Sequence, residues 1–360
     1  MLINIILFLV GLVLLIKGSD FFVEASASIA KKLGVSELVI GLTLVALGTS
    51  IPELASSVIA SLKQHSGLII GNVIGSNIAN IGLIVGIAAT ITAIKTKEHM
   101  LKRDGYIMIF VTVVFYIFML NNSISRIEAG VFLLFYFAYI VFLFEVEAKE
   151  EDESHFREFI RYFFRFKYLL TVHSRILAGI RYQKKNDHKL KKEKVSPVEK
   201  KEVKELFKAG IYKDYLTIVI SGIAIVFGAK YLVEGAIYFA SAFNVSDTLI
   251  GVSIVALGTS LPELSVSISA ARKGYGNIVV GNIIGSNIAN ILLVTGVSAL
   301  ILPLKVISST IVFTGPFMIL MSILLLVFIK SYWQIKRIEG TIFLILYTVF
   351  IMLLFFNGFM

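Results

Sequence analysis

The stretch GLTLVALGTSIPELASSVIAS, from Gly41 to Ser61, decides the fold, because it returns as GVSIVALGTSLPELSVSISAA from Gly251 to Ala271. A second block follows each copy: GNVIGSNIANI from Gly71 to Ile81 and GNIIGSNIANI from Gly281 to Ile291. The offset is 210 residues throughout, and 24 of the 42 positions from Ile40 to Ile81 are identical without a gap. The chain therefore contains a duplicated unit.

The composition is that of a membrane protein. Hydrophobic residues make up 57% of the 360 residues, whereas soluble domains contain roughly 45–50%. Apolar runs long enough to cross ~30 Å of hydrocarbon recur along the chain. There is no cysteine, which excludes disulfides and thiolate metal sites. The net charge of +10 mostly reflects loop placement in such a protein, so no nucleic-acid partner is expected.

The apolar runs predict an all-α integral membrane protein with ten transmembrane helices, five in each repeat. Three regions follow: a first repeat over 1–145, a charged linker over 146–213 and a second repeat over 214–360. The expected helices cover about Leu2–Ile16, Glu37–Leu62, Leu68–Ile94, Tyr106–Leu120, Ile127–Phe144, Asp214–Val233, Asp247–Ala271, Asn277–Leu302, Val306–Ile329 and Ile338–Phe356. A cleaved signal peptide is the alternative for the first run, but no positive residue precedes it, and Gly18 to Gly41 aligns with Gly228 to Gly251.

An odd number of helices per repeat makes the second repeat enter the membrane from the opposite side. Alternate loops differ in charge as this requires, with eleven basic residues on one side and three on the other. The eleven are Lys31, Lys32, Lys95, Lys97, Lys102, Arg103, Arg272, Lys273, Lys330, Lys336 and Arg337; the three are Lys63, Arg126 and Lys305. The positive-inside rule then places both termini outside the cell membrane and the linker in the cytoplasm. Two inverted five-helix repeats are typical of secondary transporters.

The linker leaves two interpretations open. Residues 155–182 place Arg157, Arg161 and Arg165 beside several Phe residues, which fits a basic amphipathic helix on the anionic inner leaflet. A plain tether between the two halves is the other interpretation, and it is the one we favour.

Each repeat places a carboxylate beside a proline inside an apolar run. Pro52 and Pro262 have no N–H, so the carbonyl four residues earlier loses its partner and the turn opens. Glu53 and Glu263 follow these prolines directly, and hydroxyls such as those of Thr49 and Ser50 precede them. Oxygen ligands of this kind suit hard cations such as Ca²⁺ and Na⁺, and two carboxylates balance one Ca²⁺.

Two alternatives are a protonated Glu and a structural cation. Because no Lys or Arg lies in the mid-portions of the repeat helices, a transported cation is favoured. In the GSNIAN blocks, Gly71, Gly75, Gly82 and Gly86 predict tight helix packing. The Asn residues can act as interhelical glue, but Ser76 and Asn80 share a helix face, as do Ser286 and Asn290. We expect these four residues to be ion ligands.

The motif pair G-T-S-x-P-E-L and G-N-x-x-G-S-N-x-x-N, present twice, resembles the α-repeats of the sodium/calcium exchangers in the cation/Ca²⁺ antiporter superfamily, prokaryotic branch. The resemblance covers about Gly11–Thr90 and Ser221–Leu300. It implies that Glu53 and Glu263 hold Ca²⁺ with the carbonyls of Thr49 and Thr259. The sodium ligands it implies are the same Glu pair, the carbonyls of Ala46 and Ala256, and the hydroxyls of Ser50, Ser260, Ser76 and Ser286.

The resemblance also implies that Asn80 and Asn290 line the central site. Some prokaryotic relatives have Asp at the position of Asn290, so this chain has two acidic ligands rather than three. The expected function is secondary active Na⁺/Ca²⁺ antiport by alternating access, with electrogenic Ca²⁺ extrusion, no cofactor and a monomer sufficient for activity. Proton-coupled and potassium-dependent antiport remain open.

Two other classes are disfavoured. All five His residues fall outside the membrane cores and form no H-E-x-x-H zinc motif, so we expect no enzyme. A cation channel usually closes its pore by oligomer symmetry or with a carbonyl-lined loop. Here one chain supplies both halves of the expected site, which favours alternating access.

The predicted topology can be tested with membrane-impermeant thiol labels on single cysteines. Labels at Gln64, Asn122 and Met360 should react from outside intact cells. Labels at Lys97, Lys192 and Lys273 should react only after permeabilisation, because the basic loops stay in the cytoplasm. A cytoplasmic Met360 would rule out the inverted arrangement.

Overall fold

The computed structural model of the protein describes residues 2–33, 37–62, 64–96, 98–149, 156–168, 212–228, 230–231 and 256–356. Most of the linker lies outside these ranges, as do parts of the expected helices Asp214–Val233 and Asp247–Ala271. Within them the chain is nearly all helical, with four strands of two residues each and several π-turns, labelled η.

The first half contains α1 (Leu2–Leu33), α2 (Glu37–Ile40), η1 (Gly41–Val45), α3 (Ala46–Thr49), α4 (Ile51–Leu62), α5 (Ser66–Ala79), η2 (Asn80–Val85), α6 (Gly86–Ile91), β1 (Ile94–Lys95), α7 (Glu98–Met100), η3 (Leu101–Gly105), α8 (Tyr106–Met119), β2 (Ser123–Ile124) and α9 (Arg126–Lys149). A short helix, α10 (Phe156–Phe164), follows. Residues 212–228 are also helical.

The second half contains α14 (Ala256–Thr259), α15 (Leu261–Arg272), α16 (Gly276–Ala289), η5 (Asn290–Val294), α17 (Thr295–Ile301), β3 (Leu304–Lys305), η6 (Thr310–Thr314), α18 (Gly315–Tyr332), β4 (Gln334–Ile335) and α19 (Arg337–Phe356). Its elements follow the order of the first half at an offset of 209 to 211 residues. The π-turns obey the same rule, since η2 begins at Asn80 and η5 at Asn290.

The two halves are joined by contacts that occur in equivalent pairs, related by exchange of the halves. Strand β1 pairs antiparallel with β4, with Ile94 opposite Ile335, and β2 pairs with β3, with Ile124 opposite Leu304. Exchanging the halves turns β1–β4 into β3–β2, so each pairing is the counterpart of the other. The contacts of α6 with α19 and of α17 with α9 are related in the same way. The duplicated sequence therefore builds one interlocked body.

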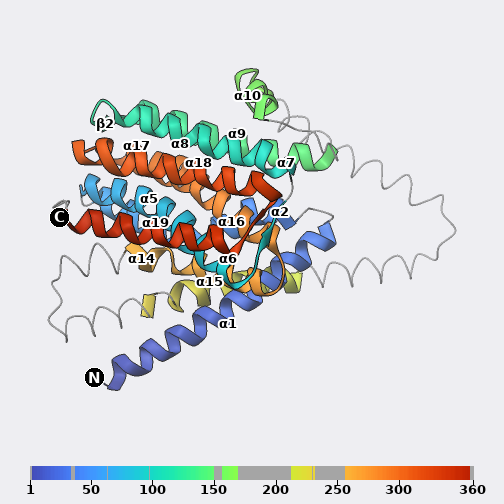
Figure 1. Ribbon diagram of the computed structural model, residues 1–360. Helices are drawn as coiled ribbons and strands as arrows, with labels where there is room; N and C mark the ends of the chain where they lie inside the picture. The colour runs from blue at the N-terminus through green and yellow to red at the C-terminus, as the bar shows by residue number, and fades with distance from the viewer. Residues whose placement is uncertain are drawn as a thin grey trace, which may run out of the picture.

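The two GSNIAN helices occupy the centre of this body. Figure 1 shows α8, α9, α17, α18 and α19 running in about the same direction, with α1 crossing them obliquely. In an 18-residue apolar stretch of Gly276–Ile301, 94% of the residues are buried, and in one of Ser66–Ile91 72% are. In Arg337–Leu354 the share is only 17%. The repeated motifs thus lie in protein and the outer helices are left to face lipid.

Glycine permits the closest helix contacts. A Cβ on Gly285 would lie 2.6 Å from the carbonyl oxygen of Leu42, so α16 touches the backbone of η1 directly. A Cβ on Gly82 would lie 2.8 Å from Tyr347 in α19, which confirms the expected packing role. No described atom lies within 4 Å of such a Cβ on Gly71 or Gly75, and their packing role stays a prediction.

Six described helices are long and apolar enough to cross a membrane, and a bent pair makes a seventh. The pair is Leu38–Thr49 and Ile51–Leu62, which meet at 41°. Each of the seven overlaps an expected helix. The expected end of the first helix at Ile16 was wrong, because α1 continues to Leu33 and its apolar span is Ile6–Ile29. Of the other three, α8 has 14 residues and continues from η3, and two lie partly outside the described residues. Ten spans therefore remain a prediction.

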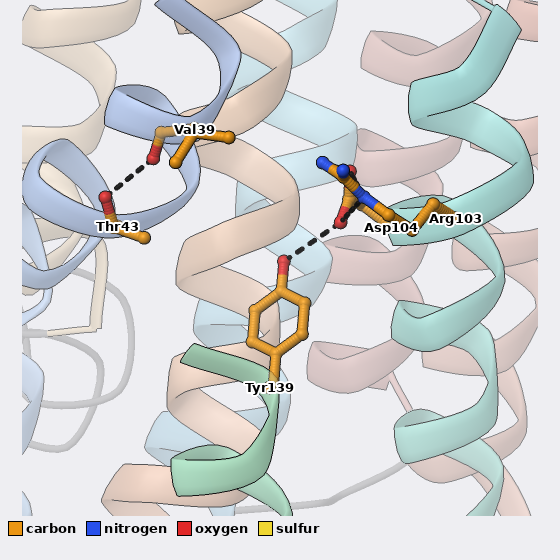
Figure 2. Close-up of polar contacts among 5 residues, drawn as sticks. All are labelled: Val39, Thr43, Arg103, Asp104 and Tyr139. Carbon is orange, nitrogen blue, oxygen red and sulfur yellow. Dashed lines mark hydrogen bonds and ion pairs between the residues drawn. The ribbon is translucent and has the colours of Figure 1, made fainter. Parts of the chain in front are cut away.

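Among the described basic residues of the charge count, Arg103 is buried rather than solvated. Arg103 is 3% exposed and forms a two-nitrogen ion pair with the fully buried Asp104, at 2.9–3.1 Å. Figure 2 shows the hydroxyl of Tyr139 directed at the same carboxylate, 3.4 Å from Oδ1. Counting Arg103 as a loop charge was wrong, because Asp104 neutralises it. Ten basic residues against three still favour the same orientation.

Helix α10 packs against η3 and the side of α9 by its aromatic face. Phe163 stacks on Phe135 with ring centroids 4.1 Å apart, and Phe159 meets Tyr139 edge-on at 6.2 Å. Phe156 lies 5.5 Å from Phe110. The described start of the linker is therefore docked on the first repeat through this face.

The Gly285 contact predicts a stability change. Gly285→Ala places a methyl group 2.6 Å from a backbone oxygen that cannot rotate away, so we expect a loss of about 1–3 kcal/mol from overpacking. Gly130→Ala in α9 is the matched control, since no described atom lies within 4 Å of its Cβ position. Thermal unfolding of the detergent-purified proteins measures the difference. Equal midpoints for the two variants would contradict the close contact.

Candidate functional site

A helix break in each half opens the site. Ser50 separates α3 from α4 with φ −83° and ψ 6°, and Ser260 separates α14 from α15 with φ −88° and ψ 3°. These dihedrals lie in the sparsely populated bridge region that residues of active sites often adopt. Pro52 and Pro262 follow two residues later, where their missing N–H ends the preceding ladder. The sequence-predicted break is therefore present in both halves.

The break puts each carboxylate at the start of a new helix. Glu53 lies in the first turn of α4 and Glu263 in the first turn of α15. The partial positive charge of a helix N-terminus stabilises an anion there by about 0.3–1 kcal/mol, and by up to about 2 kcal/mol when partly buried. Glu53 is 1% exposed and Glu263 is fully buried. No described Lys or Arg pairs with either, so the helix ends and neighbouring hydroxyls supply their local stabilisation.

The carboxylates meet at the interface of the halves. Ser50 Oγ donates to Glu263 Oε1 at 3.2 Å, and Thr49 also lies beside Glu263. In the reciprocal arrangement Thr259 and Ser260 lie beside Glu53. The two carboxyl groups are close enough to repel each other electrostatically. Each half therefore supplies hydroxyls to the carboxylate of the other.

The GSNIAN helices add more oxygen atoms around the breaks. Ser286 Oγ lies 3.5 Å from Thr49 Oγ1 and 3.5 Å from the carbonyl oxygen of Ala46. In the other half, Ser260 Oγ lies 3.4 Å from Ser76 Oγ. Ala256 begins α14, directly after residues outside the described range. The structure therefore brings Ser286 beside Thr49 and Ala46, and Ser76 beside Ser260, while their role as ion ligands stays a prediction.

Asn80 and Asn290 begin the π-turns η2 and η5, and both are at most 1% exposed. Each uses its Nδ2 to donate to an amide of the opposite half. No donor in the part of the chain that the structure describes reaches Oδ1 of either residue. The same holds for Oε2 of both carboxylates, so four buried acceptor oxygens lack a donor.

These four oxygens form two symmetric pairs and all are acceptors. Buried polar atoms are nearly always paired in native proteins, and carboxylate and amide oxygens are ligands that Ca²⁺ prefers. Glu53 with Glu263 also supplies the two negative charges that one divalent cation needs. The arrangement is therefore chemically suited to hold a hard cation.

The sequence reasoning assigned no site role to four polar residues, and it considered one of them, Asn77, only as interhelical glue. Asn72 and Asn282 accept from the hydroxyls of Thr259 and Thr49 at 3.3 and 3.2 Å. Asn77 and Asn287 bond the amides of Asn290 and Asn80. All four stand at identical positions in both GN-x-x-GSN blocks, and that repetition was the available signal. Their roles depend on contacts across the halves, which the sequence does not display.

Sequence comparison with known proteins points to one family. The sodium/calcium exchanger protein family model matches residues 3–145 and 213–356. The chain is 51% identical to Sodium/calcium exchanger MaX1 of Methanosarcina acetivorans, over 98% of this chain and 99% of that protein. It is 33% identical to an uncharacterized membrane protein of Methanocaldococcus jannaschii, over 95% of each.

Solved structures show the same relationship. A structure of the sodium-calcium exchanger NCX_Mj, soaked with Na⁺ and Sr²⁺, superposes with a TM-score of 0.75 at 30% identity, covering 98% of both chains. The fold is therefore the helical membrane fold of that exchanger. Since transporters make up this family, the expectation that the chain is not an enzyme fits as well. The chain belongs to the sodium/calcium exchanger protein family, in its prokaryotic branch.

Proposed function

We propose that this protein exchanges Na⁺ for Ca²⁺ across the cell membrane by alternating access, using one central site shared between its halves. The observation that carries the proposal is the set of four buried, donor-free oxygens from Glu53, Glu263, Asn80 and Asn290. A site for an anion or a sugar would present donors as well. A set made only of acceptors suits a metal cation.

Charge balance favours calcium at the carboxylates. An ionisable residue at the bilayer centre costs roughly 2.5–3.5 kcal/mol on insertion scales, and two like charges add repulsion. One Ca²⁺ cancels both charges of Glu53 and Glu263. In the proposed site the backbone carbonyls of Thr49 and Thr259 complete its coordination, since the helix breaks bring these residues beside the Glu pair.

Sodium uses the flanking hydroxyls and carbonyls in this proposal. The ligands are the carbonyls of Ala46 and Ala256 and the hydroxyls of Ser50, Ser260, Ser76 and Ser286, together with the Glu pair. The contacts of Ser286 with Ala46 and of Ser260 with Ser76, at 3.5 and 3.4 Å, support this grouping. Because Na⁺ and Ca²⁺ share both carboxylates, the two ions compete, and one must leave before the other binds.

The proposed architecture is ten transmembrane helices in two inverted repeats, 1–145 and 214–360, joined by the linker 146–213. The β1–β4 and β2–β3 pairings support it, because each joins loops that the charge pattern assigns to one side. In Figure 1 the start of α1 and the end of α19 lie at the same end of the bundle. Ser28, near the other end of α1, bonds Asp214 at 2.7 Å. This favours outside termini and a cytoplasmic linker.

The partners in this proposal are the two ions and the lipid bilayer. Anionic lipids of the inner leaflet are a further partner for the segment 155–182. Arg157, Arg161 and Arg165 are exposed on the outer side of α10 and the turn after it, which supports that contact. Since one chain supplies both halves of the site, a monomer is sufficient for exchange.

Loss of either carboxylate should abolish calcium transport while the protein still folds. A unit charge pair at about 4 Å is worth roughly 4 kcal/mol near a protein surface. Glu53→Gln and Glu263→Gln should therefore lower Ca²⁺ affinity by more than about 100-fold. Tracer Ca²⁺ uptake into Na⁺-loaded vesicles measures this, and size-exclusion profiles check folding. Wild-type uptake by either variant would exclude that carboxylate from the site.

Electrogenic exchange is the second expected outcome. Two carboxylates balance one Ca²⁺ or two Na⁺, so a third Na⁺ makes the sodium-loaded carrier positive. With Asn290 in place of an acid, no third charge absorbs that ion. Moving one net charge is driven by about 2.3 kcal/mol per 100 mV. Ca²⁺ uptake into Na⁺-loaded vesicles should therefore be faster at an inside-positive potential, clamped with valinomycin and potassium.

The other outcomes of this experiment identify other mechanisms. Uptake indifferent to the potential means two Na⁺ per Ca²⁺. Uptake that is independent of Na⁺ but responds to a pH gradient means proton coupling. Uptake that requires neither a counter-ion nor a gradient means a channel.

A further inference from the structure

Four asparagine amides, two from each half, form a buried cluster between α5–η2 and α16–η5. They are Asn77, Asn80, Asn287 and Asn290, each at most 2% exposed. Asn77 and Asn287 correspond at an offset of 210 residues, as do Asn80 and Asn290. The Asn80 and Asn290 amides are ligands in the proposed ion site, and the other two have no role in it.

The hydrogen bonds of the cluster cross between the halves in reciprocal fashion. Asn80 Nδ2 donates to Asn287 Oδ1 at 3.0 Å, and Asn290 Nδ2 donates to Asn77 Oδ1 at 3.2 Å. An amide has its oxygen and nitrogen on opposite branches. Anchoring the nitrogen of Asn80 and of Asn290 therefore turns the oxygen of each away from the cluster, and these are the oxygens without a donor.

Further contacts keep Asn77 from rotating. Its Nδ2 lies 3.4 Å from the backbone oxygen of Asn287 and 3.7 Å from Met318 Sδ, both acceptors. A flipped amide would set Oδ1 against that backbone oxygen and Nδ2 against the nitrogen of Asn290. Both new contacts would be repulsive, so only one orientation is favourable.

Asn287 is held by the equivalent pattern. Its Nδ2 lies 3.8 Å from Met108 Sδ, the counterpart of Met318 at an offset of 210 residues. A flip would place its Nδ2 against the nitrogen of Asn80. The pattern is thus repeated in both halves, although the sulfur atoms are weak acceptors.

We propose that Asn77 and Asn287 are positioning residues, which turn the amide oxygens of Asn290 and Asn80 toward the transported cation. The inference rests on the proposed site. This arrangement also makes position 290 selective for an amide. A carboxylate there would place a second acceptor oxygen against Asn77 Oδ1. Partners that orient metal ligands in this way are typically worth 10–100-fold in metal affinity.

The test is a double-mutant cycle on exchange in vesicles that contain the full chain. Asn77→Leu should raise the half-saturating Ca²⁺ concentration about 10-fold, with maximal rate changed less than about twofold. Asn290→Leu should do the same. If Asn77 acts through Asn290, the double variant should be no worse than the worse single variant. The cycle of Asn287→Leu with Asn80→Leu should give the same result.

A control separates positioning from general damage. Thr112→Val removes another buried hydrogen bond, from Thr112 to the backbone of Met108, without touching an amide. Its half-saturating Ca²⁺ concentration should equal the wild-type value. Asn77→Ser, a smaller change that also removes the amide, replaces Asn77→Leu if the latter does not fold.

The outcomes distinguish the two proposals. Fold-changes that multiply in the double variants, or an equal rise in Thr112→Val, would overturn the positioning role while exchange itself stands. Absence of Na⁺-dependent Ca²⁺ uptake by the wild-type chain would instead overturn the proposed function. Non-multiplying fold-changes in both cycles, with an unchanged control, support the inference.

Discussion

Two carboxylates buried together, with no basic partner in the described chain, are the constraint on which the rest of this structure depends. Glu53 and Glu263 are at most 1% exposed, and lipid cannot solvate them. They persist because each stands at the start of a helix and beside hydroxyls from the opposite half. Among the described residues, no cationic side chain compensates their remaining negative charge.

Bringing these carboxylates together dictates the surrounding packing. Helix α16 must approach η1 until backbones touch, which only glycine at 285 allows. The breaks at Ser50 and Ser260 free backbone and hydroxyl oxygens at the same depth as the carboxylates. The amides of the GSNIAN helices then supply the remaining oxygens. The packing and the positions of these oxygens are therefore set by the same few small and polar residues.

The two halves are not equivalent away from the centre. The first half buries Arg103 and Asp104 in η3 and covers them with α10. The corresponding turn of the second half, η6, carries Phe313 and Thr314 instead, and Phe313 stacks on Phe350. The described start of the linker, α10, therefore docks on the half that carries this ion pair. The polar contacts at the centre are symmetric, whereas the periphery differs between the halves.

The duplication, the membrane class, the helix breaks and the buried carboxylates of the candidate site could be predicted from the sequence alone, because each depends on local chemistry repeated at a fixed offset. Pro52 and Glu53 predict a broken helix and a buried charge without any knowledge of which residues lie beside them. The roles of Asn72, Asn77 and Arg103 were decided only by the tertiary structure. Each depends on which residue lies opposite: Thr259 and Asn290 come from the other half of the chain, and the burial of Arg103 against Asp104 depends on packing that no periodicity displays.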